Sequence, residues 1–439
     1  MKKVILASLI IGVGLMALIV IDKTLVSRSG FGGLARIVVG ILSVWAIFCV
    51  GSLVAYTKGF GRLVTRLWAS MLLTAGLFLT VDLLLGVLLI VRLSPRITAD
   101  AFVHHRLEPN TLSDFATPEY RYLQRVNNLG LRGADVETRK RPGTVRILML
   151  GDSFTMGKGV ADEKTFSALL ERSLNAKRPW AGKAIQVLNG GVDSYAPVLS
   201  RIQLTRLAPV LEPDLVVHNF DMSDLLQEVA YRRAATVGAD GEIVGVNGLR
   251  PGDEDEILSG HAVSSWIDHH MFGTRLLLYL VKTAIRKADE YTINDTVQTA
   301  NPDLLKHTLA SDTVDRTDQW ALVFDSILET KRYCDERRIK YMLTVYPWGH
   351  QVNDREWGPG RTFLIPAGSV ISDSSRERLK AFAVENGIIT LDLFPAFRNY
   401  SGSDRLYFDY DQHWTEAGHQ MMAHHLDQFI QASYFSKPE

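Results

Sequence analysis

The stretch VRILMLGDS, residues 145–153, decides the fold of the larger part of the chain. Its first six residues form a short, mostly apolar run after a Pro-Gly turn, a pattern that predicts a buried β-strand. Gly151, Asp152 and Ser153 follow directly. A side chain just beyond such a strand lies at the carboxyl edge of a sheet, where parallel α/β sheets bind their ligands.

Four more short apolar runs follow, and helical patterns lie between them. We expect strands at 185–188, 215–218, 341–346 and 388–391. We expect helices at 163–176, 320–334, 374–385 and about 415–430. Strands that alternate with helices indicate a parallel sheet covered on both faces. The sequence therefore predicts an α/β domain over residues 143–433, with an insertion at about 231–310.

Three apolar runs dominate residues 1–92. They cover about 4–21, 37–56 and 67–91, and each approaches the roughly 20 residues that a helix needs to cross a bilayer. A signal peptide is the alternative for the first run, but no small-residue cleavage site follows it, so we expect a retained helix. The sequence predicts three transmembrane helices, followed by an irregular connector at 93–142.

Basic residues near these runs predict the orientation of the chain. Lys2 and Lys3 precede the first run, and Lys58, Arg62 and Arg66 lie between the second and third. Because cytoplasmic loops carry an excess of Lys and Arg, we expect both groups inside and the domain outside. The sequence thus predicts a multi-pass cytoplasmic-membrane protein whose soluble domain faces the exterior, or the periplasm in a two-membrane bacterium.

Asp82 interrupts the third apolar run. A carboxylate at membrane depth is costly, so it faces a bundle interior or a partner. Two interpretations stay open, a hydrogen-bonded residue within the helices and a docking point for another membrane protein. Cys49 and Cys334 are far apart and make no disulfide framework, and we expect both to be buried thiols.

Ser153 is the candidate nucleophile. A serine hydroxyl needs a base to take its proton, usually a histidine that a carboxylate orients. Asp411 and His413 stand two residues apart before the last predicted helix, close enough in a loop for the carboxylate to reach the imidazole. Asp409 is the alternative orienting carboxylate. An oxyanion hole could draw on the Ser153 N–H, the turn 189–195 and the segment 219–224.

These residues together resemble the SGNH/GDSL hydrolase superfamily over about residues 143–433. The shared features are Gly-Asp-Ser after the first strand, Asn-x-Gly-Val at 189–192, a polar cluster after the third strand and Asp-x-His-Trp at 411–414. The last motif, with Tyr-Pro-Trp at 346–348, is similar to that of membrane-anchored bacterial proteins that O-acetylate exopolysaccharides such as alginate. The resemblance implies a three-layer, flavodoxin-like sheet.

The resemblance also implies an oxyanion hole, from which this sequence departs twice. The family's second block has a glycine whose N–H enters the oxyanion hole, and counting from Asn189 the equivalent position is Ser194. Gly191, in the same turn, is a further candidate. In its third block the family has an asparagine donor, and the equivalent position is Ser223. Ser194 can still offer a backbone N–H. Three interpretations of the missing side-chain donor stay open: Ser223 or Asn219 replaces it, the enzyme is slow, or the protein does not turn over.

The resulting hypothesis is a serine esterase or O-acyltransferase without a cofactor, acting on an ester-bearing glycan or small ester outside the membrane. Another membrane protein of a polysaccharide-modification system is a further partner to consider. The alternative is a non-catalytic glycan-binding or assembly subunit with the same fold. An α/β-hydrolase lipase fits poorly, because Thr155 occupies the last position of the Gly-x-Ser-x-Gly elbow.

Other residues favour no further chemistry. The formal net charge of zero gives no indication of nucleic-acid binding. The adjacent histidines 269–270 and 424–425 lack the spacing of a zinc site, so no metal is expected. Asp221 and Asp224 are expected as solvated loop acids or a helix cap. Trp348 and Trp414 fit either a sugar-binding cleft or the core.

Overall fold

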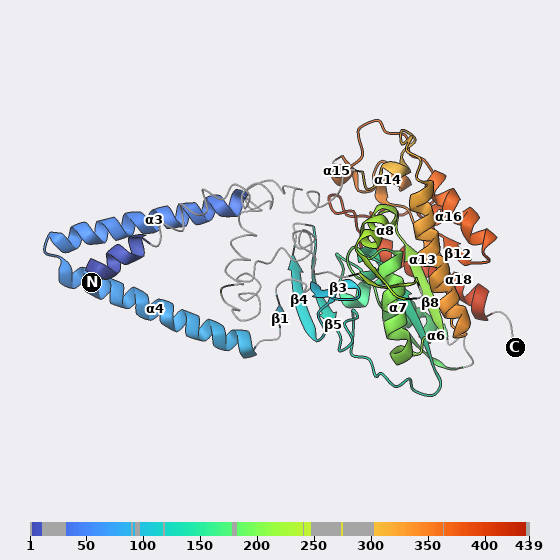
Figure 1. The fold of residues 1–439 in the computed structure, drawn as a ribbon, viewed down its shortest axis with the longest axis horizontal. Helices are drawn as coiled ribbons and strands as arrows, with labels where there is room; N and C mark the ends of the chain where they lie inside the picture. Colours follow the sequence, from blue (N-terminus) through green and yellow to red (C-terminus); the bar gives the residue numbers. More distant parts are fainter. Residues whose placement is uncertain are drawn as a thin grey trace. The chain divides into compact units, whose positions relative to one another are not determined.

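The structure, a computed structural model, forms two compact units, one of Met1–Leu89 with Gly260–Leu280 and one of Ile90–Ser259 with Val281–Glu439 (Figure 1). Its description covers residues 2–10, 32–88, 91–92, 97–116, 119–177, 182–239, 241–246, 274, 303–362 and 364–435. The second unit contains the predicted α/β domain.

A five-stranded parallel sheet forms the centre of the second unit, as the sequence predicts. Its order is β12 (Ile389–Asp392), β11 (Lys340–Val345), β8 (Leu215–Phe220), β6 (Thr144–Leu150) and β7 (Ala184–Asn189). The strand β6 pairs with the edge strand β7 on one side and with the central strand β8 on the other. Its residues 145–150 are all buried, which explains the continuous apolar run.

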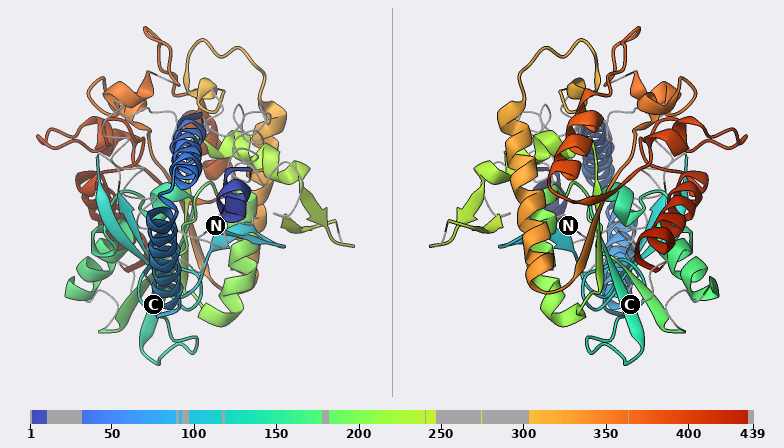
Figure 2. Two further views of the ribbon diagram at one scale, coloured as in Figure 1. Left: turned by 90° about the vertical axis from the view of Figure 1, so that its left-hand side faces the viewer. Right: turned by 90° about the vertical axis from the view of Figure 1, so that its right-hand side faces the viewer.

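Helices cover both faces of this sheet. On one face α6 (Phe166–Lys177) packs against α18 (Glu416–Ile430). On the other, α7 (Pro197–Leu211) and α8 (Asp224–Arg233) pack against α13 (Thr317–Glu336). Figure 2 shows α13 in orange and α18 in red on opposite sides of the strands. The expected layered α/β architecture is therefore present.

Short helices occupy the loops of this unit, and one longer helix, α16 (Ser374–Glu385), packs beside β12. The short ones are α5 (Ser153–Met156), η1 (Asp162–Lys164), η2 (Lys306–Thr308), α14 (Gly349–Val352), α15 (Gly358–Arg361), α17 (Phe394–Arg398) and η3 (Gln431–Phe435). Of these, α5 follows β6 and carries Ser153.

The expectation of an irregular connector at 93–142 is wrong for most of that segment. It contains two antiparallel hairpins, β2 (Ile97–Asp100) with β3 (His104–Leu107) and β4 (Thr111–Ala116) with β5 (Arg121–Val126). In β5 Gln124 is buried while Leu123 is 51% exposed. Buried and exposed positions alternate along β5, but apolar and polar residues do not follow that alternation. The sequence pattern therefore did not indicate a strand.

Two further short pairings complete the described strands. The strand β1 (Val91–Arg92) pairs with β4, and β9 (Ala235–Val237) forms a hairpin with β10 (Ile243–Val246). The β9–β10 hairpin lies at the start of the predicted insertion. Apart from residues 274 and 303–310, the later part of that insertion lies outside the described residues.

The first unit contains the predicted membrane region. Residues 2–10 are helical, and α3 (Gly32–Thr57) and α4 (Gly61–Leu88) follow. Among the described residues one helix, Gly61–Leu84, has the length and apolar composition to cross a membrane, and the apolar stretch Leu42–Thr57 is shorter. The first predicted run extends beyond the described residues, so the three spans stay a prediction.

Asp82 has a hydrogen-bond partner within its own unit. Its side chain is buried and accepts from the backbone N–H of Thr274 at 2.9 Å and from the Thr274 hydroxyl. This contact supports the interpretation of Asp82 as an internally hydrogen-bonded residue. The alternative, a docking point for another protein, stays untested.

Candidate active site

Ser153 is the first residue of α5, directly beyond the carboxyl end of β6. Asp152 caps this short helix, and its carboxylate accepts from the Phe154 N–H at 2.9 Å. Gly151 has a φ of +147°, and a Cβ there would lie 2.3 Å from Thr155 Oγ1. The Gly-Asp-Ser sequence is therefore required by the tight turn that presents the Ser153 hydroxyl.

The structure brings Ser153, His413 and Asp411 into one hydrogen-bonded chain. Ser153 Oγ lies 2.6 Å from His413 Nε2, and His413 Nδ1 contacts Asp411 Oδ1. The backbone N–H of His413 also donates to that oxygen, at 3.0 Å. Asp409 makes no such contact; its carboxylate is half exposed and lies 3.9 Å from Arg405. Of the two candidate acids, Asp411 is therefore the one that contacts the imidazole.

The charge of Asp411 determines which nitrogen of His413 carries the proton. Burial alone raises the pKa of Asp411, but the neighbouring imidazole of His413 and the hydrogen bonds it receives bring this pKa below its usual range. An ionised carboxylate only accepts hydrogen bonds, so Nδ1 donates to it. Nε2 is then free to accept the Ser153 proton.

The loop that carries the acid and the base is held by the segment around α15. Trp357 Nε1 donates to the carbonyl of Tyr410 at 2.9 Å, and the N–H of Gly360 donates to the carbonyl of Asp409 at 2.9 Å. Glu356 accepts from the N–H groups of the two residues at the start of the loop, Leu406 and Tyr407. The main chain of this loop is therefore held in place by several hydrogen bonds.

The turn after β7 contributes the two predicted backbone positions. Ser194 is exposed, has a φ of +59° in the region that favours glycine, and no hydrogen bond of the described residues uses its N–H. The N–H of Gly191 instead donates to Asn189 Oδ1 at 3.0 Å. A Cβ at Gly191 would lie 2.1 Å from the Met156 nitrogen, so this glycine allows the turn to pack against α5.

The two predicted side-chain donors of the oxyanion hole are engaged elsewhere. Asn219 Nδ2 donates to the carbonyl of Leu150 at 3.1 Å, and its oxygen accepts from Thr344 Oγ1 at 2.7 Å. Ser223 Oγ donates to Gln227 Oε1 at 3.3 Å. In this arrangement Asn219 links neighbouring strands through one of its two N–H groups, and the Ser223 hydroxyl bonds to a residue of α8.

Three buried carboxyl groups lie behind the nucleophile, and two of them correct an expectation. Asp221 and Asp224 were expected to be solvated, yet they and Asp152 are at most 4% exposed. Burial raises the pKa of each of the three. Asp221 also accepts from Trp348 Nε1 at 2.7 Å. Asp224 accepts from the Asp221 N–H at 2.9 Å, but Ser223 is the N-cap of α8 and no side chain among the described residues caps this helix.

Aromatic side chains surround this cluster, but they belong to the core. Trp348 and Trp414 are 3% and 1% exposed. Phe154 packs against both, with ring centroids 5.7 and 5.1 Å apart. Their burial supports the core interpretation over a sugar-binding cleft.

Sequence reasoning missed three residues that hold the site together. Glu119 and Tyr120 contact the acid loop, and Arg132 binds the loop after α5. All three come from the segment expected to be an irregular connector. Their contacts join residues far apart in the chain, and no local pattern marks them.

The described residues contain no candidate metal site. No group of three or more His, Cys, Asp or Glu side chains there is arranged to hold a metal ion. His424 and His425 are neighbours whose rings lie at 80° to each other, and His424 contacts Gln428. The other pair, residues 269–270, lies outside the described residues.

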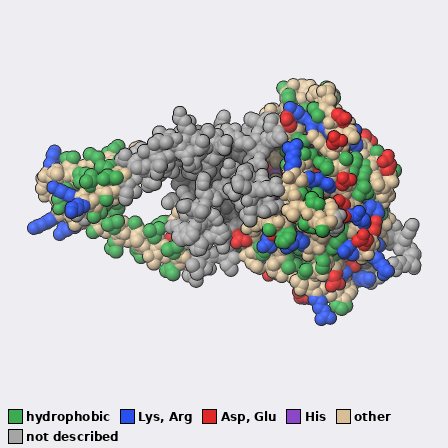
Figure 3. Space-filling model, viewed as in Figure 1, with side chains coloured by type: hydrophobic (Ala, Val, Ile, Leu, Met, Phe, Trp, Pro, Cys, Tyr) green, Lys and Arg blue, Asp and Glu red, His purple; other side chains and the backbone are tan. Residues whose placement is uncertain are grey.

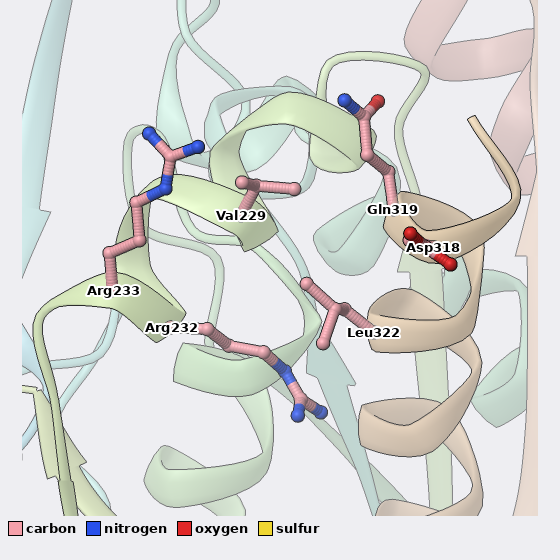
Figure 4. A pocket seen from close by; sticks show the side chains of 6 residues that line it. All are labelled: Val229, Arg232, Arg233, Asp318, Gln319 and Leu322. Atoms are coloured by element: carbon pink, nitrogen blue, oxygen red, sulfur yellow. The ribbon is translucent and has the colours of Figure 1, made fainter. Parts of the chain in front are cut away.

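A surface hollow of about 430 Å³ lies between α8 and α13, with none of the candidate residues in its lining (Figure 4). Arg232 projects beside it and pairs with Glu228 and Ser326. The lining residues are Val229, Arg232, Arg233, Asp318, Gln319 and Leu322. This hollow is separate from the Ser153 site.

This chain is similar to several solved structures. No protein-family model matches it, and no curated protein matches. Solved structures that are similar include a putative lipolytic protein of the G-D-S-L family from Desulfitobacterium hafniense, with 12% identity, 65% of this chain and 99% of that chain covered, and a TM-score of 0.32. A lipase/acylhydrolase from Enterococcus faecalis has 13% identity, 67% and 100% coverage, and a TM-score of 0.34. A mutant acetyl-xylooligosaccharide esterase from Geobacillus has 14% identity, 67% and 97% coverage, and a TM-score of 0.34.

Proposed function

We propose that this chain catalyses acyl transfer from an ester, with Ser153 as nucleophile, His413 as general base and acid, and Asp411 as the orienting carboxylate. The observation that carries the proposal is the continuous hydrogen-bonded chain from Ser153 Oγ through both nitrogens of His413 to Asp411. A serine hydroxyl becomes a nucleophile when a histidine takes its proton and a carboxylate orients that histidine.

The first half of the reaction transfers the acyl group to the enzyme. Ser153 Oγ attacks the carbonyl carbon of the ester while its proton passes to His413 Nε2. The oxyanion that forms accepts from the N–H groups of Ser153 and Ser194. The bond to the alcohol then breaks, and the departing oxygen takes the proton from Nε2.

The second half returns the enzyme to its starting state. A water molecule or a sugar hydroxyl gives its proton to Nε2 and attacks the acyl carbon. Ser153 Oγ departs and recovers that proton. The product is a carboxylic acid when water is the acceptor and a new ester when a hydroxyl is the acceptor, so one site supports an esterase or an O-acyltransferase.

We further propose that the substrate is an ester-bearing glycan outside the cytoplasmic membrane. The first unit supports membrane anchoring, because α3 and α4 carry exposed apolar side chains such as Ile47 and Leu73 (Figure 3). Lys2 lies over the ring of Tyr56, near Lys58 and Arg62 at the turn between these helices. Basic residues gathered at one end of the helices favour that end as the cytoplasmic one.

The full chain in detergent tests the activity with p-nitrophenyl acetate as substrate. Ser153→Ala and His413→Ala should each lower the hydrolysis rate by about 10³-fold or more, because either change breaks the chain of proton transfer. Ser403→Ala, in an exposed loop, is the matched control and should keep full activity. Hydrolysis at the wild-type rate by Ser153→Ala would rule out this mechanism.

A second candidate function is a glycan-binding or assembly subunit that does not turn over. The internal hydrogen bonds of Asn219 and Ser223 favour it, because they engage the two side chains expected to supply the oxyanion donor. Losing one such donor costs roughly 10²–10³ in rate. Absence of any reaction between Ser153 and a fluorophosphonate probe, together with measurable glycan binding, would support this second function.

A further inference from the structure

We propose that Tyr120, with Glu119, is a positioning residue for Asp411, supplied by the β4–β5 segment. Tyr120 OH donates to Asp411 Oδ2 at 2.7 Å. The contact joins residues 291 positions apart, from a segment that precedes the α/β domain. This inference rests on the proposed acyl-transfer function and extends the site by two residues.

The hydrogen bonds of Asp411 explain why Tyr120 matters. Oδ1 accepts from the backbone N–H and the Nδ1–H of His413. Oδ2 accepts from Tyr120 on the other side of the carboxylate. With donors on both oxygens the carboxylate cannot rotate, so it holds the imidazole plane in one orientation toward Ser153.

Glu119 fixes the main chain that carries this carboxylate. Its two oxygens accept from the N–H groups of Tyr410 and Asp411, at 2.9 and 2.8 Å. Trp357 and Gly360 donate to carbonyls on the preceding part of the same loop. The peptide groups next to Asp411 are therefore held on their N–H side by Glu119 and on their carbonyl side by the α15 segment.

The ring of Tyr120 is itself well placed. It packs against Phe408 with ring centroids 4.9 Å apart, and against Tyr122 with centroids 5.8 Å apart. Phe408 belongs to the acid–base loop, and its N–H donates to the carbonyl of His413 at 3.1 Å. A phenylalanine at position 120 can keep these ring contacts, so Tyr120→Phe removes the hydroxyl alone.

The first measurement is steady-state hydrolysis of p-nitrophenyl acetate by the full chain. Tyr120→Phe should lower kcat about tenfold and leave KM unchanged, because one hydrogen bond to a charged group is lost without contact to the substrate. Labelling of Ser153 by a fluorophosphonate should slow by a similar factor. The control is Tyr434→Phe, which removes a hydroxyl that donates to the Tyr341 carbonyl, and it should match the wild type.

A double-mutant cycle separates positioning from a general structural role. If Tyr120 acts through Asp411, then Tyr120→Phe should have no further effect on kcat in an Asp411→Ala background. A Tyr120→Phe variant that reacts at the wild-type rate would overturn the inference. An equal loss of kcat on Tyr120→Phe in the wild-type and Asp411→Ala backgrounds would also overturn the inference.

A variant of Glu119 and an NMR signal of His413, which does not depend on turnover, complete the test. Glu119→Gln keeps the size of the side chain but only one acceptor, and it should slow the labelling severalfold. The downfield proton NMR signal of the His413 Nδ1–H should shift in Tyr120→Phe and stay unchanged in Tyr434→Phe. If Ser153→Ala keeps full hydrolysis, the proposed function fails, whereas an unshifted NMR signal in Tyr120→Phe overturns the positioning role alone.

Discussion

At the scale of single residues, four buried carboxyl groups near Ser153 fall into two opposite electrostatic states. Asp411 receives hydrogen bonds from His413 and Tyr120, and its pKa is lowered although burial opposes this. For Asp152, Asp221 and Asp224 burial dominates and raises the pKa. The charge of Asp221 raises the pKa of Asp152 further, and the charges of Asp221 and Asp152 raise that of Asp224. The site thus favours the charged form of Asp411 and the neutral form of Asp152, Asp221 and Asp224.

Replacement of Asp224 by asparagine should stabilise the protein at neutral pH. An acid with a raised pKa binds its proton more tightly in the folded state, so its contribution to stability is lost as pH rises above about 4. One oxygen of Asp224 accepts from the Asp221 N–H, and an amide oxygen can do the same. We expect Asp224→Asn to raise the free energy of unfolding by about 1 kcal/mol at pH 7.

Thermal melts from pH 4 to pH 8 check this prediction. The difference in Tm between Asp224→Asn and the wild type should grow as pH rises. Asp303→Asn, a substitution at a half-exposed carboxylate, serves as control. Its Tm should differ little from that of the wild type at every pH. An Asp224→Asn variant that is less stable across the whole range would contradict the assignment.

At the scale of elements, the nucleophile turn depends on a segment outside the sheet. Arg132 follows β5, and its side chain is only 1% exposed. It donates to the carbonyls of Met156, Gly157 and Val160 and pairs with Asp162 at 2.8 Å. These carbonyls belong to α5 and the loop after it, so one guanidinium satisfies the main chain that follows Ser153.

Arg132→Ala should destabilise the second unit and slow the reaction of Ser153. Three buried carbonyls would lose their donor, at a cost of at least about 2 kcal/mol in the free energy of unfolding. Arg132→Lys should recover only part of this, because an ammonium cannot reproduce the planar arrangement of donors. Denaturant unfolding and fluorophosphonate labelling measure the two effects, with the exposed Arg337→Ala as control. Equal stability of Arg132→Ala and Arg337→Ala would contradict this role.

At the scale of the whole molecule, the chain combines an apolar helical unit with an α/β unit. Apolar side chains face outward on α3 and α4, whereas those of the second unit form a core on both sides of its sheet. Basic and acidic side chains are interspersed on the face of the second unit that Figure 3 shows. This difference supports the proposal that the helical unit lies in a membrane.

Protease treatment of sealed membranes tests the proposed topology. We expect residues 97–435 to be digested from the outer face of spheroplasts and to be protected in inverted vesicles, because the basic end of the helices stays in the cytoplasm. A tag at the N-terminus should show the opposite accessibility. Digestion of the α/β unit in inverted vesicles would overturn the orientation.

The sequence alone determined the five strands, most of the long helices, and the acid and base that face Ser153. These features depend on short-range patterns, namely a buried run ending in Gly-Asp-Ser and an acid two residues from a histidine. The tertiary structure decided the rest. Asn219 and Ser223 bond internally, Asp221 and Asp224 are buried, and the segment before the domain forms strands that support the site. Hydrogen bonds such as that from Tyr120 to Asp411 form between residues distant in the chain, and only folding brings such residues together.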